Sequence, residues 1–371
     1  MFRGRQASSQ MKLILMCCAL LFAQPISVSS PDSSYTIDEY MNSQVKESRF
    51  SGAILVARSG KVLLAKGYGF ANIELNVLND PSSKFRLGSV SQQFTATAIL
   101  DLQEEGRLNI LDSVCKYIPE CPYNWQEIKI VNLLAHTSGI SNFTELPDYE
   151  STSMLPTTVP ELLARFKDKP LEFRPGEKFK YSNSGYQVLG AVIENVSGRP
   201  YAKYLAEHIF APLEMRDTGY DSSTIILPHR VSGYRQNGDK NSFLNATYLD
   251  MSIPFSAGGL YSTVEDLYRW DRALYNEKLI SKKSLDQMYT PYRDGYGFGW
   301  KILKEFQRRV LMSAGRINGF SASIRRYLDD DACVIVLGNL ESIDAEKISH
   351  DLGAILFDVP LKPPMDDQSL R

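Results

Sequence analysis

The sequence predicts an α/β (α+β) fold in which both chain ends contribute strands to one antiparallel sheet, flanked by helices. Strand-like segments gather near residues 52–65 and again near residues 296–337. Helix-like segments fill most of the region between them, so a mainly helical subdomain at about 89–250 is expected as an insertion. Strands this distant in sequence must find partners, and one shared sheet is the most economical arrangement.

The N-terminal part of this domain is expected to begin with a helix at residues 37–47. Apolar residues 52–58 follow, then Ser59-Gly60, then a second apolar run at 61–65. Two β-rich runs separated by a short turn sequence indicate a hairpin.

A buried helix is expected directly after Ser89. Val90, Phe94, Ala98 and Leu102 recur every four residues, and Gly106 follows the segment. Further helices are expected at 130–134, 159–166, 186–196, 201–210 and 263–274. The last of these starts with Ser262-Thr-Val-Glu265, the pattern of a capping box.

The C-terminal part returns to strand character. Strands are expected at 296–303, 308–312, 322–328 and 332–337, followed by a helix at 344–357. We therefore expect one domain over residues 30–358 and a loose tail over 359–371.

The N-terminus has the order of a secretory signal peptide. Arg3, Arg5 and Lys12 precede an apolar run at 13–23, and small residues follow at 27–29. The apolar run is shorter than the roughly 20 residues of a membrane span. We expect a signal peptide at 1–29 and a secreted or periplasmic/extracellular protein, with an uncleaved anchor helix as the alternative.

The composition of the chain argues against several classes of ligand. The chain has 41 basic and 43 acidic residues, so nothing in its charge suggests a nucleic-acid partner. Its four histidines show no metal-ligand spacing and no Cys-x-x-Cys pair exists, so neither a metal nor a cofactor is expected. Cys115 and Cys121 are a candidate disulfide of an oxidising compartment, whereas Cys333 is expected to be a buried small hydrophobe.

Two short segments have residues suited to nucleophilic catalysis. Ser89 follows a glycine and opens a helix, whose free N–H groups favour a developing oxyanion. Gln92, three residues on, lies on the same helix face. Tyr181 and Asn183 are two apart in an extended stretch and face the same side. Each segment alone has a simpler explanation, a helix cap for Ser89 and a turn with a cap for the other.

Taken together, these segments resemble the class C branch of the serine β-lactamase and penicillin-binding-protein family. Gly88-Ser-Val-Ser91 is followed by Phe94-Thr95, and Tyr181-Ser-Asn183 lies about 90 residues further on. The companion segments that resemble this family, in the same order, are Phe50-Ser-Gly-Ala-Ile-Leu-Val56, Leu133-Leu-Ala-His-Thr-Ser-Gly139, Arg174-Pro-Gly-Glu177, Ala257-Gly-Gly-Leu-Tyr-Ser262 and Asn318-Gly-Phe320.

The resemblance implies roles for individual residues. Ser89 would be the nucleophile, with Tyr181 as its catalytic partner. Gln92, Asn183, Ser313, Gly315 and Arg316 would be binding residues, with the backbone N–H groups of Ser89 and Arg316 forming an oxyanion hole. His136 lies in a family segment outside the catalytic motifs, which implies a structural role.

Two positions depart from the family pattern. The first motif is Ser-x-x-Lys in the family but ends in Gln92 here, and the third motif begins with Ser313 where the family has Lys or His. Gln92 can form hydrogen bonds but cannot accept a proton, and loss of a general base typically slows a reaction by about 10²–10⁴-fold.

Two functional hypotheses therefore remain. The first is a secreted hydrolase of the β-lactamase/D-alanyl-D-alanine carboxypeptidase type, acting weakly on an amide or ester through an acyl-Ser89 intermediate. The second is an inactive family member that binds a peptide or cell-wall-type ligand in the former cleft. Both imply a small-molecule or peptide ligand, and formation of a covalent adduct at Ser89 distinguishes them.

Overall fold

The computed structural model describes Met1 and residues 33–361. Beyond Met1, the expected signal peptide lies outside the described residues, as does the expected tail after residue 361. Among the helices of residues 33–361, none combines the length and the apolar character needed to cross a bilayer.

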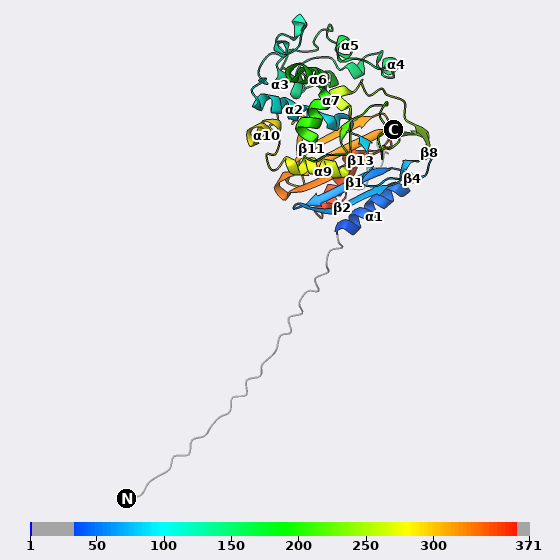
Figure 1. Ribbon diagram of the computed structural model, residues 1–371. Helices are drawn as coiled ribbons and strands as arrows, with labels where there is room; N and C mark the ends of the chain where they lie inside the picture. Colours follow the sequence, from blue (N-terminus) through cyan, green and yellow to red (C-terminus); the bar gives the residue numbers. More distant parts are fainter. Residues whose placement is uncertain (2–32, 362–371) are drawn as a thin grey trace, which may run out of the picture. The chain divides into compact units, whose positions relative to one another are not determined.

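A six-stranded antiparallel sheet joins the two ends of the chain, as the sequence predicts (Figure 1). Its strand order is β10-β11-β12-β13-β1-β2, so the first strand pairs with the last one, with Gly52 opposite Gly338. The strands are β1 (Gly52–Arg58), β2 (Lys61–Tyr68), β10 (Lys301–Glu305), β11 (Arg308–Ile317), β12 (Phe320–Tyr327) and β13 (Ala332–Gly338).

Helices cover both faces of this sheet, which explains why its central strands are apolar throughout. On one face, α1 (Ser33–Lys46) and α11 (Ala345–Leu356) pack on a core that includes Ile54 and Val56. On the other face, α9 (Val264–Ala273) packs on a core that includes Leu55 and Ala57. Successive residues of a strand point to opposite faces, so a strand covered on both sides shows no polar alternation.

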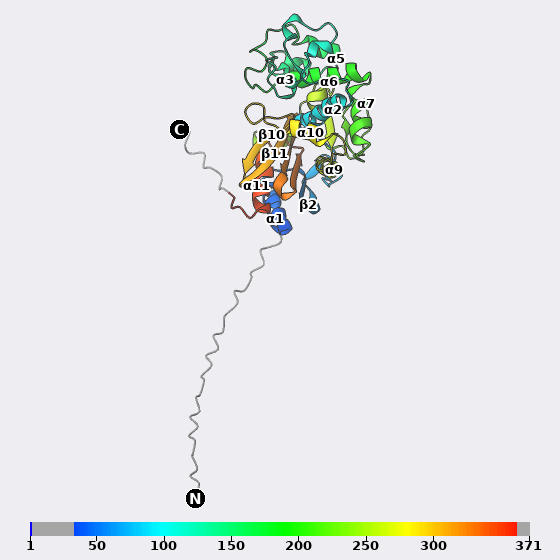
Figure 2. The ribbon, with the colours of Figure 1, turned by 90° about the vertical axis from the view of Figure 1, so that its left-hand side faces the viewer.

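A helical region lies beside the sheet and is inserted between β2 and β10 (Figure 2). Its longest helices, α2 (Gln92–Glu104) and α6 (Asn183–Ser197), pack against each other. The other elements are α3 (Ile130–Leu134), α4 (Tyr149–Thr152), α5 (Val159–Ala164), α7 (Tyr201–Leu205), α8 (Phe255–Gly258), α10 (Lys282–Met288) and the π-helical turn η5 (Ala206–Phe210). The expected helix at 201–210 is therefore α-helical in its first half only.

Several short strands were not expected from the sequence. They form a three-stranded sheet of β5 (Phe85–Arg86), β9 (Leu260–Ser262) and β6 (Gly219–Tyr220), and two small hairpins, β3 (Phe70–Asn72) with β4 (Val77–Leu78) and β7 (Tyr234–Asn237) with β8 (Asp239–Asn245). Five of these strands, β3, β4, β5, β6 and β9, have only two or three residues and leave no detectable periodicity in the sequence.

Two local expectations are wrong. The strand expected at 296–303 begins only at Lys301, because Gly299 has a φ of +73° and the chain turns there. The capping box expected at Ser262 and Glu265 is displaced by one residue. Thr263 is the N-cap of α9, and its side chain accepts a hydrogen bond from the Asp266 N–H. Ser262 instead belongs to β9, and its hydroxyl contacts Thr218.

Candidate active site

The turn that carries Ser89 lies directly against strand β11. Ser89 is in a single 3₁₀ turn, η1 (Gly88–Ser91), that leads into α2. A Cβ atom at Gly315 would lie 2.1 Å from the Leu87 carbonyl oxygen and 2.6 Å from the Ser89 backbone nitrogen. Glycine is therefore required at 315, because any side chain would push β11 away from the serine turn.

Ser89 opens into a cavity of about 320 Å³ beside the edge of β11. Of the residues that the sequence singled out, five line it: Ser89, Tyr181, Ser313, Gly315 and Arg316. The charged cavity residues Lys301 on β10 and Glu346 on α11 were among those that the sequence missed. They lie far from the motifs in sequence, and only the pairing of β10 with β11 and the packing of α11 on the sheet bring them here.

Gln92 and Asn183 do not line the cavity, and Gln92 links the Asn183 and Tyr181 side chains. Gln92 is fully buried. Its Nε2 donates to the Tyr181 hydroxyl oxygen at 2.6 Å and to Asn183 Oδ1 at 3.3 Å. Tyr181 in turn forms a hydrogen bond with Ser89. The structure thus groups these four residues, although Ser89 lies in η1 and Tyr181 lies in the stretch just before α6.

His136 is a member of this group that the sequence did not indicate. It is 1% exposed, and its Nε2 lies 3.2 Å from Gln92 Oε1. Its ring also packs against those of Tyr181, Tyr186 and Tyr296. His136 has a φ of +53°, a conformation that histidine adopts more readily than most residues. Sequence spacing carries no sign of this contact, because the His136 loop meets α2 only through the tertiary fold.

Tyr181 and His136 are held in their neutral forms. Burial raises the pKa of Tyr181 to about 12, although its hydrogen bonds with Ser89 and Gln92 act in the opposite direction. Burial also lowers the pKa of His136 to about 3. Both hydrogen-bond partners of Tyr181 are uncharged, so neither supplies the cation that would favour a phenolate.

Comparison with known proteins places this arrangement in a family. A family model described as Beta-lactamase matches residues 36–354. The chain belongs to the Beta-lactamase family. Over 318 residues it is 32% identical to a putative penicillin-binding protein, PbpX, of Bacillus subtilis (strain 168), covering 85% of this chain and 76% of that protein.

Solved structures of this family have the same fold. The octameric penicillin-binding protein homologue from Pyrococcus abyssi is 26% identical with a TM-score of 0.78, and the match covers 88% of this chain and 77% of that one. A D-amino acid amidase from Ochrobactrum anthropi SV3 is 20% identical with a TM-score of 0.79, over 88% of this chain and 99% of that one. At that identity the likeness concerns the fold alone.

Cysteines lie away from the cavity in this β-lactamase-family chain. The structure places a disulfide between Cys115 and Cys121, in the loops that follow α2. Cys333 is a free, fully buried thiol on β13, and burial raises its pKa. None of these three residues lines the cavity at Ser89.

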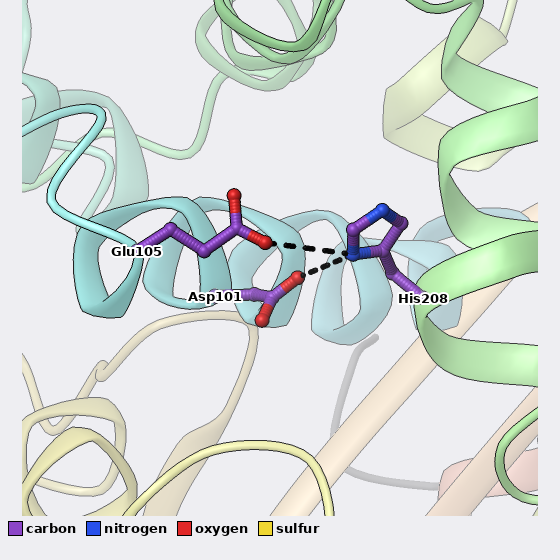
Figure 3. A group of neighbouring side chains, drawn as sticks. All are labelled: Asp101, Glu105 and His208. Carbon is purple, nitrogen blue, oxygen red and sulfur yellow. Dashed lines mark hydrogen bonds and ion pairs between the residues drawn. The ribbon is translucent and has the colours of Figure 1, made fainter.

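A second histidine cluster lies at the other end of α2 (Figure 3). Asp101, Glu105 and His208 bring three atoms suited to a metal within 4.8 Å of one another. Spacing along the chain did not reveal this group, because His208 comes from η5. Each member already has a protein partner: Tyr204 donates to Asp101 at 2.7 Å, and Arg107 pairs with Glu105 at 3.3 Å. Hydrogen bonds and ion pairs account for this arrangement, and we propose no metal there.

Proposed function

We propose that this chain is a penicillin-binding-protein-like serine hydrolase of the class C-related branch, which cleaves an amide or ester through an acyl-Ser89 intermediate. The observation that carries this proposal is the position of the Ser89 hydroxyl. It faces a cavity, stands at the start of a buried helix and is hydrogen-bonded to Tyr181. A relative described as a putative penicillin-binding protein supports the same reaction class.

In the proposed acylation, Ser89 Oγ attacks the carbonyl carbon while its proton moves to Tyr181. Tyr181 then delivers a proton to the leaving nitrogen or oxygen as the bond to carbon breaks, so Tyr181 ends unchanged. The backbone N–H groups of Ser89 and Arg316 would stabilise the oxyanion. In support, a Cβ atom at Gly88 would lie only 3.0 Å from the Arg316 backbone nitrogen, so the two backbones approach closely.

Slow acylation follows from the chemistry of Gln92 and Ser313. In this proposal they occupy the places of the family's lysine and of its third-motif Lys or His. With a Tyr181 pKa of about 12, only about 10⁻⁵ of the phenol is ionised at pH 7. Base catalysis by Tyr181 is then weak near neutrality, and the oxyanion hole supplies much of the remaining rate.

The same neutral network favours a second candidate, a binding protein without turnover. Lys301, Arg316 and Glu346 give the cavity charged groups of both signs. A peptide or cell-wall fragment with a free carboxylate could pair with the two cations without any reaction at Ser89. The cleft would then bind its ligand without reacting with it.

The proposal also includes export of the protein from the cytoplasm. The basic and apolar pattern at residues 3–23 supports cleavage near residue 29 and a location outside the cytoplasm. N-terminal sequencing of the exported protein tests this, because retention of Met1 or Met11 would contradict it.

Covalent labelling separates the hydrolase from the binder. The purified protein is incubated with a fluorophosphonate or a β-lactam, and intact mass spectrometry follows the adduct with time. We expect one adduct per chain, which Ser89→Ala abolishes. Ser91→Ala is the matched control, since Ser91 lies in the same turn but is buried and accepts a hydrogen bond from the Leu260 N–H. A parent protein that binds the ligand reversibly yet forms no adduct would leave the binder as the function.

A further inference from the structure

The tautomer of His136 follows from its backbone contact. The Ser182 N–H donates to His136 Nδ1 at 3.2 Å, so Nδ1 is an acceptor and carries no proton. Burial keeps the ring neutral, because it lowers the pKa of His136 to about 3. A neutral imidazole has one N–H, and here it must be on Nε2.

This tautomer determines which way the Gln92 amide points. His136 Nε2 donates to Gln92 Oε1 at 3.2 Å, which leaves the Gln92 NH₂ group to face Tyr181 and Asn183. In the flipped amide, an NH₂ group would oppose the His136 N–H. The Gln92 oxygen would also oppose Asn183 Oδ1. Both contacts would leave buried polar atoms unpaired, so the flipped form is disfavoured.

The amide orientation controls the role of the Tyr181 hydroxyl. When Gln92 donates to the Tyr181 oxygen, the donated bond stabilises the phenolate that accepts the Ser89 proton and later passes it to the leaving group. A flipped amide would instead accept the Tyr181 proton and stabilise the phenol. These two forms differ only in the rotation of the Gln92 side-chain amide group.

We infer that His136 is a positioning residue for acylation: by donating from Nε2 to Gln92, it keeps the Gln92 amide donating to Tyr181, so that the Tyr181 oxygen can take the proton of Ser89. This inference rests on the proposed serine hydrolase, which it deepens. His136 touches neither the substrate nor Ser89. It acts through Gln92, and Gln92 acts through Tyr181.

Other ionisable groups near Tyr181 do not take this role. Tyr186 and Tyr296 are neutral, since burial raises the pKa of both. The charged groups lining the cavity are Lys301 on β10, Arg316 on β11 and Glu346 on α11. These three stay unchanged in the variants below, so they contribute equally to every comparison.

A double-mutant cycle tests the chain of contacts through labelling of Ser89. His136→Phe keeps an aromatic ring but cannot donate, and should slow labelling at least tenfold. Gln92→Met removes the amide, and in that background His136→Phe should change the rate less than twofold. His136→Gln retains a donor and should recover at least threefold over His136→Phe. Equal slowing by His136→Phe in both backgrounds would overturn the inference.

Tyr186→Phe is the matched control for packing damage. It removes the buried hydrogen bond from the Tyr186 hydroxyl to the Leu134 carbonyl, in the same aromatic cluster. Labelling by Tyr186→Phe should stay within twofold of the parent. If Tyr186→Phe slows labelling as much as His136→Phe does, a general loss of packing explains both and the inference fails.

A measurement that does not depend on labelling tests the His136 tautomer separately from the proposed hydrolase function. Nitrogen-15 NMR of the histidine rings, with His136 assigned by the His136→Phe variant, reports which nitrogen carries the proton. We expect protonated Nε2 and bare Nδ1 from pH 5 to pH 8. A proton on Nδ1 would overturn the inference even in a protein that labels well. A protein that shows protonated Nε2 but never labels would contradict the hydrolase alone.

Discussion

Two histidines contact helix α2 at its opposite ends, and their surroundings differ sharply. His136 contacts Gln92 in the first turn, is fully buried and faces an amide. His208 lies 3.1 Å from Asp101 in the last turns, with Glu105 at 3.9 Å, and its side chain is 30% exposed. Charged groups thus surround His208 at the solvent-facing end of the helix, while His136 at the other end contacts an uncharged amide.

This difference concerns the charge of the groups that surround Tyr181. A buried cation needs a partner, because desolvation of a charge is expensive. Around Tyr181, hydrogen bonds between neutral groups replace such a pair, which preserves the shape of the site but leaves Tyr181 with a pKa of about 12. In the proposed hydrolase, this network would position Tyr181 while leaving it a weak base near neutral pH.

The pH dependence of labelling should be the largest effect. If Tyr181 acts as a base with a pKa of about 12, the fraction of phenolate grows tenfold with each pH unit below that value. Labelling of Ser89 should then rise about 100-fold from pH 7 to pH 9. Rates by intact mass, corrected for probe hydrolysis, test this. A flat profile would mean that a neutral phenol relays the proton.

Gln92→Lys should give the next largest effect. Lysine would place a cation beside Tyr181 and lower the pKa of the phenol, so labelling of Ser89 should become at least tenfold faster. Ser313→His should raise the rate again in that background. Gln92→Lys also removes the acceptor of the His136 N–H, so the thermal unfolding of this variant must be measured. A folded Gln92→Lys protein that labels no faster than the parent would favour the binder.

The stability of the protein at acid pH should report the burial of the neutral His136 ring. The folded pKa of His136 is about 3, below its ordinary value of 6.5, so between these values the unfolded chain binds a proton that the folded chain does not. Below about pH 6.5, His136 should therefore lower the free energy of unfolding by about 1.4 kcal/mol per pH unit. Urea unfolding at pH 6.5 and pH 5 should show a shallower loss for His136→Phe. Parallel curves would contradict the buried, neutral ring.

His208→Ala should have the smallest effect. The pair of His208 and Asp101 is partly exposed, so its removal should change the free energy of unfolding by less than about 1 kcal/mol. Labelling of Ser89 should not change, since this cluster lies at the far end of α2. A labelling change above threefold would show that the two ends of the helix are coupled.

The sequence predicted what local pattern encodes and missed what only the tertiary fold brings together. The apolar run at 52–58 and the four-residue spacing after Val90 were sufficient for β1 and α2. The match of the short motifs to a known family located Ser89 and Tyr181. The same match implied that Gly315 and Arg316 lie beside Ser89. The contact of His136 with Gln92 joins segments far apart in sequence, and no periodicity reports such a contact.

The pairing of the first strand with the last has a consequence for how the chain folds. Strand β1 is synthesised early, but its neighbour β13 follows about 280 residues later, so at about 5–20 residues per second it waits on the order of 14–56 seconds. Until then, one edge of the β1–β2 hairpin has no partner, and the sheet that supports Ser313 and Gly315 cannot close. Contacts of such long sequence separation slow folding. The growing chain therefore stays open until synthesis is nearly finished, which is the state in which a protein can still be threaded through a membrane pore.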